Sequence, residues 1–157
     1  MRLIFLGPPG IGKGTQAKLL AERHSLAHLS TGDMFRSVIS RNTDLGTFAK
    51  SFMDKGKLVP DDVVLGMVNE RLREDDTASG YIFDGFPRTV PQVEGFKKLL
   101  KELGQIIDHV IALEGNDTVL VERLSSRRTC SDCGKIINLI FSPPKVSGQC
   151  DDCGGEI

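Results

Sequence analysis

The sequence predicts an α/β protein in which helices flank a parallel β-sheet and a small metal-binding module follows. Three observations predict this class. Short apolar runs alternate with stretches of helical period as far as Leu124. A glycine-rich loop, Gly7–Thr15, separates the first apolar run from the first helical stretch. All four cysteines lie between Cys130 and Cys153, in two C-x2-C pairs.

The composition is that of an ordinary globular protein. The chain has 157 residues, a net charge of −1 and a pI near 6.3, so it lacks the basic excess that favours nucleic acid or a membrane surface. No apolar run approaches the roughly 20 residues that span a bilayer. Paired cysteines in a chain without a signal-peptide core are typical of a reducing compartment. We therefore expect a cytoplasmic protein with no membrane or nucleic-acid partner.

The first elements are two strands around one helix. Arg2–Leu6 ("RLIFL") is a short apolar run that ends at a glycine, as buried strands do. Residues 14–24 then predict a helix, because good helix formers follow the loop. Ala27–Ser30 ("AHLS") predicts a second strand.

Two further helices are expected before the next strand. The first covers residues 31–41, and Ser30 or Thr31 is placed to cap it. The second covers residues 45–57 and closes at Gly56.

The middle of the chain predicts a longer helix and a third strand. Residues 60–75 begin with a proline and two acids, which are favourable in a first helical turn. The apolar residues of this stretch keep the helical period; they are Val63, Val64, Met67, Val68 and Leu72. Tyr81–Asp84 ("YIFD") is the third strand.

The last part of the predicted sheet repeats this alternation. The helical stripe there consists of Val93, Phe96, Leu100 and Leu103. His109–Leu113 predicts a fourth strand, and Asn116 can cap a helix that carries Val119, Leu120 and Leu124. Strands that alternate with helices imply a parallel sheet with right-handed crossovers.

The loop Gly7–Thr15 ("GPPGIGKGT") has the features of a phosphate-binding loop. Glycines let backbone N–H groups approach phosphate oxygens, the helix N-terminus adds positive charge, and Lys13 can reach the terminal phosphates. The pattern departs from the strict motif, because Gly14 stands where Ser or Thr should follow the lysine and Thr15 comes one place later. A purely structural glycine turn is the alternative, and the strand–loop–helix context argues against it.

Asp84 is the second candidate for nucleotide chemistry. An acid at the end of a parallel strand near a phosphate loop holds Mg²⁺, often through water. A lone acid in this position is otherwise a turn residue, and the neighbours "GFPRT" favour the metal interpretation.

Four thiolates predict a structural zinc site. Their spacing, C-x2-C-x16-C-x2-C, suits tetrahedral Zn²⁺, and the ligands are Cys130, Cys133, Cys150 and Cys153. Four protein ligands leave no open position, so we assign the zinc no catalytic role. Gly134 and Gly154 follow the pairs, where tight turns can aim N–H groups at sulfur. Four free thiols or two disulfides are the alternatives.

Four stretches together carry a family resemblance. They are residues 7–16, 30–36, 84–92 and 127–135 ("GPPGIGKGTQ", "STGDMFR", "DGFPRTVPQ" and "RRTCSDCGK"). On these residues the chain resembles an adenylate kinase of the long, zinc-lidded bacterial type, and glycine followed by threonine after the lysine is that family's habit. The resemblance implies the P-loop nucleoside monophosphate kinase fold and reversible transfer, ATP + AMP = 2 ADP, with Mg²⁺ and a structural Zn²⁺.

The resemblance also implies residue roles. ATP would be bound by Gly10, Ile11, Gly12, Lys13, Gly14, Thr15, Arg123 and Arg127. AMP would be bound by Thr31, Arg36, Met53, Lys57, Leu58, Val59, Gly85, Phe86, Pro87, Arg88 and Gln92. The catalytic charges would be Lys13, Arg36, Arg88, Arg127 and Asp84, and Gln92 would read the adenine edge. Arg123 and Arg127 are four apart and are expected on one helix face.

Three domains and an incomplete end follow from the same resemblance. Residues 1–29 and 60–127 would form the core, 30–59 the AMP-binding insert and 128–157 a zinc lid. The family continues with further lid residues, a strand and a helix, and a full-length member is expected to be a monomer. We expect the 157-residue chain itself to transfer phosphate weakly or not at all, and to self-associate or need the further segment.

Three other functions compete with this hypothesis. A zinc-ribbon nucleic-acid binder would share the cysteine pairs, but the acidic pI and the phosphate loop oppose it. A phosphotransferase could use another acceptor, such as UMP or a sugar. A non-catalytic nucleotide-binding fragment is the third possibility.

Overall fold

The computed structural model describes residues 1–40 and 44–157, so Arg41, the last residue of one predicted helix, lies outside the described part. The chain divides into two compact units. The first contains Met1–Gly7 and Gly12–Leu113, and the second contains Pro8–Ile11 and Glu114–Ile157. No helix among the described residues is long and apolar enough to cross a membrane.

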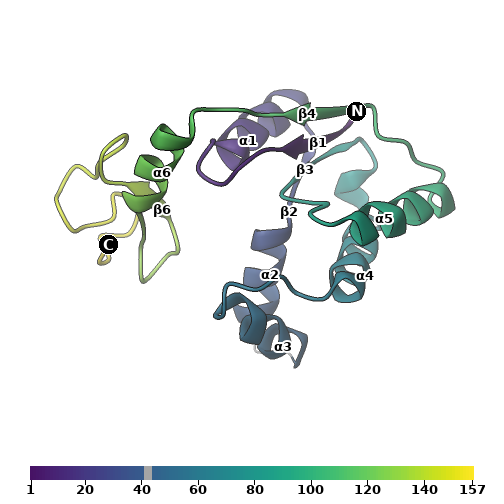
Figure 1. Cartoon of the computed structure of the whole chain (residues 1–157), viewed down its shortest axis with the longest axis horizontal. Helices are drawn as coiled ribbons and strands as arrows, with labels where there is room; N and C mark the ends of the chain where they lie inside the picture. Colours follow the sequence, from purple (N-terminus) through teal and green to yellow (C-terminus); the bar gives the residue numbers. More distant parts are fainter. Residues whose placement is uncertain (41–43) are drawn as a thin grey trace. The chain divides into compact units, whose positions relative to one another are not determined.

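A four-stranded parallel sheet forms the centre of the first unit (Figure 1). The strands lie in the order β2-β3-β1-β4. Their bounds are β1 Arg2–Leu6, β2 Ala27–Ser30, β3 Tyr81–Asp84 and β4 His109–Ala112. Ile4 of β1 pairs with Phe83 on one side and Val110 on the other. The predicted fold class is confirmed.

Helices pack on both faces of the sheet around β1 and β3, whereas β4 is largely exposed. Successive residues of β1 point to opposite faces. Leu3 and Phe5 pack with Ala17 and Ala21 of α1, which spans Lys13–His24. Ile4 faces a larger cluster on the other side. The sheet therefore has the helix–sheet–helix layering that parallel sheets require.

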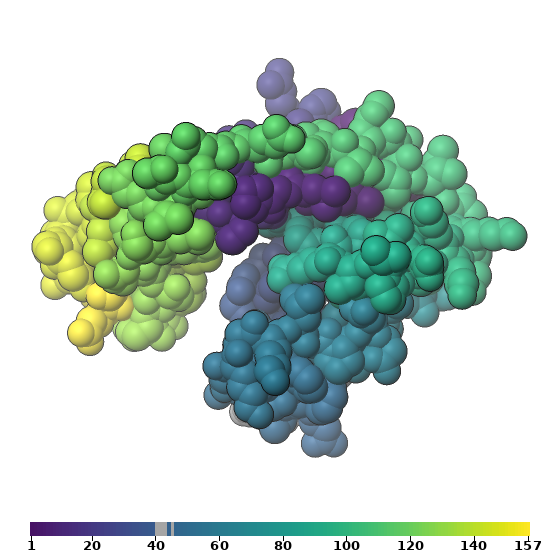
Figure 2. All heavy atoms as spheres, viewed as in Figure 1, coloured from purple at the N-terminus to yellow at the C-terminus, as the bar shows by residue number. Residues whose placement is uncertain are grey.

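The helices of the larger cluster follow the predicted elements. They are α2 Thr31–Ser40, α3 Asp44–Met53, α4 Asp61–Arg71 and α5 Val90–Glu102. The predicted stripes of α4 and α5 supply buried residues to this core, and Phe83 meets Phe86 and Phe96 with ring centroids 5.1 and 5.3 Å apart. Helices α2 and α3 pack together at the lower end of the first unit in Figures 1 and 2.

The second unit is small and has little apolar core. It contains α6 Asp117–Ser125 and an antiparallel pair, β5 Arg127–Thr129 with β6 Ile136–Asn138. Asn116 caps α6 as predicted, since its Oδ1 accepts from the N–H groups of Thr118 and Val119. Of the three apolar residues predicted on α6, Leu120 is buried, whereas Val119 and Leu124 are exposed.

Candidate nucleotide-binding site and metal centre

The phosphate loop turns sharply between β1 and α1. Gly12, the residue before α1, has a left-handed φ of 99°, which glycine adopts without strain. A side chain at position 7 would clash with the backbone, because a Cβ on Gly7 would lie 2.5 Å from the carbonyl oxygen of Leu113. Lys13 folds back and donates from Nζ to the Gly7 carbonyl at 2.7 Å.

Two neighbouring charges act on Lys13. Burial lowers the pKa of Lys13; the negative charge of Asp84 opposes this shift, and the positive charge of Arg88 adds to it. The predicted phosphate-loop cation and two of the other predicted charges are therefore close enough to influence one another.

Asp84 ends β3 next to the start of α1. A Cβ at Gly14 would lie 2.9 Å from Oδ2 of Asp84, which gives a physical reason for the glycine that breaks the strict motif. Nε2 of His28 lies 3.9 Å from the same oxygen. Burial lowers the pKa of His28, and Asp84 opposes this shift. A carboxylate beside the phosphate loop offers the hard oxygen ligand that Mg²⁺ prefers.

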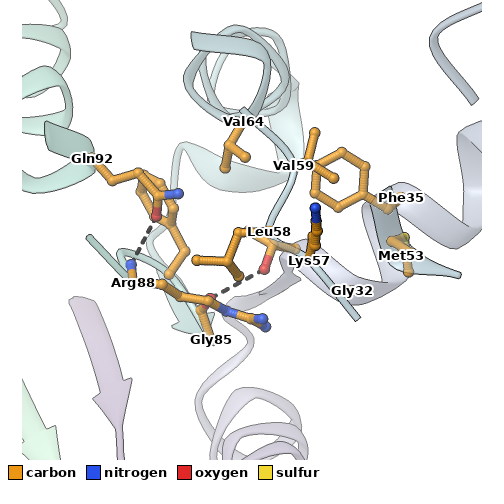
Figure 3. Close-up of a pocket in the computed structure, with 12 residues that line it drawn as sticks. Gly32, Phe35, Met53, Lys57, Leu58, Val59, Val64, Gly85, Arg88 and Gln92 are labelled. Carbon is orange, nitrogen blue, oxygen red and sulfur yellow. Dashed lines mark hydrogen bonds between the residues drawn. The ribbon is translucent and has the colours of Figure 1, made fainter. Parts of the chain in front are cut away.

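A pocket in the first unit gathers most of the residues predicted for AMP (Figure 3). The predicted residues that line it are Thr31, Met53, Lys57, Leu58, Val59, Gly85, Phe86, Arg88 and Gln92. Three lining residues were not predicted, namely Gly32, Phe35 and Val64. Arg36 and Pro87 are not among the lining residues.

Two guanidinium groups lie over glycines of this region. Arg88 donates from Nε to the Gly85 carbonyl at 2.6 Å, and a Cβ on Gly85 would stand 2.8 Å from its NH2. A Cβ on Gly32 would lie 3.3 Å from the guanidinium nitrogens of Arg36. The two glycines therefore leave room for positive charge beside the pocket.

Arg36 is held by a neighbour on its own helix. It donates to Oδ1 of Asp33 at 2.5 Å, and the Asp33 N–H in turn donates to Ser30 Oγ, which caps α2. Partial burial raises the pKa of Asp33, but the hydrogen bond and charge of Arg36 outweigh it, so the pKa is lowered. Asp33 is thus an acid of the first turn of α2 and also a partner of Arg36.

A further polar residue of the pocket is Gln92, which is only 2% exposed. Its Oε1 accepts from the backbone N–H of Arg88 at 2.7 Å (Figure 3), and its Nε2 donates to Oδ1 of Asp61 at 2.7 Å. Thr89 caps α5 by accepting from the Gln92 N–H. The pocket therefore combines apolar walls, a buried amide and a guanidinium.

The four cysteines of the second unit form one cluster. All their Sγ atoms lie within 4.8 Å of one another, with Cys130 and Cys153 at 3.5 Å and Cys133 and Cys150 at 3.6 Å. Tetrahedral zinc with Zn–S bonds of roughly 2.3 Å needs sulfurs roughly 3.8 Å apart, so the donor set fits Zn²⁺. All four thiols are free, which rules against the two-disulfide alternative.

The turns at the cysteines place backbone N–H groups beside the sulfur atoms. Gly134 and Gly154 have left-handed φ values of 71° and 74°, as their predicted turns require. The backbone N–H of Cys133 lowers the pKa of Cys130 to about 7, whereas at Cys153 the lowering effect of the Gly155 N–H is outweighed by the neighbouring thiols, which raise the pKa to about 12. The Gly155 N–H donates to Cys153 Sγ at 3.4 Å. Backbone dipoles therefore point at the sulfurs, as predicted.

The expectation that Arg123 and Arg127 share a helix face is wrong. Helix α6 ends at Ser125, because the side chains of Ser126 and Asn138 bind its last carbonyl oxygens. Arg127 therefore lies on β5 and is exposed. Arg123 stays on α6, with its guanidinium carbon 5.6 Å from the ring centroid of Phe141.

Comparison with known proteins decides the family. A family model described as adenylate kinase matches residues 5–152. The chain belongs to the adenylate kinase family. Adenylate kinases of Archaeoglobus fulgidus, Methanothrix thermoacetophila and a Geobacillus species are 52%, 51% and 50% identical to it. Each alignment covers all of this chain and 72%, 73% and 73% of the respective relative.

Sequence reasoning missed several residues of this adenylate kinase pocket. Phe35 and Val64 contribute to the core as well as to the pocket. Their apolar, helical spacing indicated only that they were core residues. Asp61 was predicted only as a first-turn acid, and its contact with Gln92 joins residues 31 apart in the chain. The roles of the individual nucleotide-binding residues stay predictions.

Proposed function

We propose that this chain binds AMP in the pocket between Thr31 and Gln92 and transfers a phosphoryl group to it from ATP. The observation that carries the proposal is the chemistry of that pocket. A purine base suits the apolar walls, with the buried Gln92 amide available to its polar edge. A phosphate suits the guanidinium groups of Arg88 and Arg36, whose planar forks match phosphate oxygens.

The residues that the resemblance assigns to ATP are those of the phosphate loop together with Arg123 and Arg127. Backbone N–H groups of residues 10–15 would bind its phosphates, and Lys13 would supply the principal charge. Arg123 with Phe141 offers a flat cationic surface for the base. Arg127, exposed on β5, would bind phosphate.

The chemistry needs positioning and charge more than covalent help. Phosphoryl transfer has a loose transition state with charge on the equatorial oxygens, so Lys13, Arg36, Arg88 and Arg127 would stabilise it. The AMP phosphate is already an anionic nucleophile, and no general base is required. Mg²⁺ bound to ATP would neutralise phosphate charge, and Asp84 would hold it, often through water.

The predicted zinc would be structural. The cluster offers four thiolates and no fifth protein donor is needed, so the ion would close the module without touching the reaction. We also propose that residues 30–59 act as the AMP-binding insert and residues 128–157 as the zinc lid. We propose a cytoplasmic enzyme whose partners are ATP, AMP and ADP, and a monomer in the full-length members of the family.

The test compares AMP, CMP, UMP and GMP as acceptors with ATP fixed. Calorimetric binding should be measured beside turnover, so that a weakly active chain still gives a result. We expect AMP to bind most tightly and to be the best acceptor. A preference for a pyrimidine nucleotide, or failure to bind AMP, would contradict the proposal. Retention on a polyanion column that falls steeply with salt would instead favour nucleic-acid binding.

A further inference from the structure

The amide of Gln92 is held from both sides within the first unit. Oε1 accepts from the Arg88 N–H and Nε2 donates to the Asp61 carboxylate, both at 2.7 Å. An amide oxygen has two lone pairs and an amide nitrogen has two hydrogens, so each atom retains a second position for another partner. Gln92 lines the pocket, so a base bound there would be the partner for these second positions.

Only one orientation of this amide satisfies both neighbours. Turning it over would place Oε1 against the Asp61 carboxylate, acceptor against acceptor. It would also place Nε2 against the Arg88 N–H, donor against donor. The amide is almost fully buried, where unpaired polar groups are costly, and its bond to Asp61 is of the stronger, charge-assisted kind. The pocket therefore presents an acceptor and a donor in fixed places.

A fixed acceptor and donor distinguish the two classes of purine. Adenine carries a donating 6-amino group beside an accepting ring nitrogen, which complements an amide oxygen and an amide N–H. Guanine and hypoxanthine carry an accepting 6-oxo group and a donating N1–H. They would need the amide in its opposite orientation.

We propose that Asp61 is a positioning residue that selects adenine over 6-oxopurines by fixing the orientation of the Gln92 amide. The inference rests on the proposed function, since it assumes that AMP occupies this pocket. Of the two groups that hold the amide, Asp61 is the one that acts through a side chain, because Arg88 contributes its backbone. The specificity of the site thus depends on a residue of α4 that is not among the residues lining the pocket.

The test replaces Asp61 by asparagine. Asp61→Asn keeps the size of the side chain, but its amide can either donate or accept, so it no longer opposes the reversed orientation of Gln92. The dissociation constants of AMP and inosine monophosphate should be measured by calorimetry on the whole chain. Asp62→Asn is the matched control, because Asp62 is the next acid in the same first turn and is exposed.

We expect the preference for AMP over inosine monophosphate to fall about tenfold in Asp61→Asn and to stay unchanged in Asp62→Asn. If Asp61 acts through Gln92, adding Asp61→Asn to Gln92→Leu should not change the preference further. Equal loss of affinity for both nucleotides would overturn the proposal, because it would mean that Asp61 only supports the structure.

Failure of the proposed function would look different. A wild-type chain that binds neither nucleotide would refute AMP binding, and the orientation mechanism with it. A wild-type chain that prefers AMP, with the same preference in Asp61→Asn, would leave AMP binding intact and refute only the role of Asp61.

Discussion

Oδ2 of Asp84 lies 2.9 Å from the position that a Cβ on residue 14 would occupy. A serine or threonine directly after Lys13, as the strict phosphate-loop motif has, would therefore press on this carboxylate. The atom in the way is the end of a side chain, so the carboxylate would move while the backbone stays. The position of the Asp84 carboxylate therefore depends on having glycine at position 14.

Gly14→Ser should lower turnover even though it restores the common motif. Displacing Asp84 moves a charge of the site, and misplacements on the order of 1 Å can cost about a hundredfold in rate. We expect kcat to fall at least about tenfold while calorimetric AMP affinity stays near wild type. Gly66→Ser, also within a helix but with open space around the new Cβ, is the control. Wild-type turnover in Gly14→Ser would show that Asp84 need not stay where it is.

Lys13→Ala should reduce turnover by about a thousandfold, the scale of a lost transition-state cation. At roughly 1.4 kcal/mol per decade this is about 4 kcal/mol. Steady-state rates with saturating AMP measure the effect. Lys98→Ala removes an exposed lysine of α5 and should leave the rate unchanged. A loss below about tenfold would mean that Lys13 does not contact the transferred phosphate.

The second unit should hold one Zn²⁺ per chain and loosen without it. Cys130 and Cys150 are themselves proposed ligands, and they are buried with Ile137 in one core cluster of this unit. Structural zinc contributes about 10–16 kcal/mol to folding in small modules. After chelation, hydrogen exchange should accelerate in residues 128–157.

The sheet of the first unit is the internal control for that experiment. Exchange in Arg2–Leu6 and Tyr81–Asp84 should stay slow after chelation, since their cores contain no cysteine. Cys150→Ser should reproduce the effect without a chelator. A zinc-free protein in which residues 128–157 remain protected would contradict the prediction.

His28 should make the stability of the fold sensitive to mild acid. Burial lowers its pKa, so the unfolded chain binds a proton more readily than the folded chain. Its contribution is full above the unfolded pKa of about 6.5 and declines as the pH falls through that value. Between about pH 7.5 and about pH 5.5, wild type should lose more unfolding free energy than His28→Gln.

Denaturant unfolding at both pH values measures this difference. Loss of zinc in acid would affect both proteins alike, so the comparison isolates His28. His24→Gln, at the exposed end of α1, should behave like wild type. Identical pH profiles for wild type and His28→Gln would show that the imidazole is protonated equally easily in both states.

Local sequence signals were sufficient for the sheet. Three of the four predicted strands have the observed bounds, and the fourth, predicted to Leu113, ends at Ala112. Buried parallel strands are short apolar runs between glycines and helices, so the neighbouring residues indicate where each strand begins and ends. Helix α6 was harder to predict, because the small second unit buries only one of the three apolar residues that were expected on this helix.

Contacts between distant residues could not be predicted in this way. Arg127 leaves the helix because Asn138, far along the chain, binds the Arg123 carbonyl at 2.9 Å. The Asp61 carboxylate reaches Gln92 in the same manner. The motifs behind the family resemblance identified most of the pocket residues. The partners that orient these residues depend on the packed fold.

The hydrogen bond from Lys13 to the Gly7 carbonyl has a consequence for ligand discrimination. The Lys13 side chain is already ordered by this hydrogen bond, so ligand binding loses less side-chain entropy there. A ligand must compete for the ammonium group with this neutral carbonyl dipole, in a field to which Asp84 also contributes. A phosphate succeeds because it brings full negative charge, whereas an uncharged nucleoside offers no better acceptor than the carbonyl it would displace. The backbone carbonyl of the loop therefore favours anionic ligands over uncharged nucleosides at Lys13.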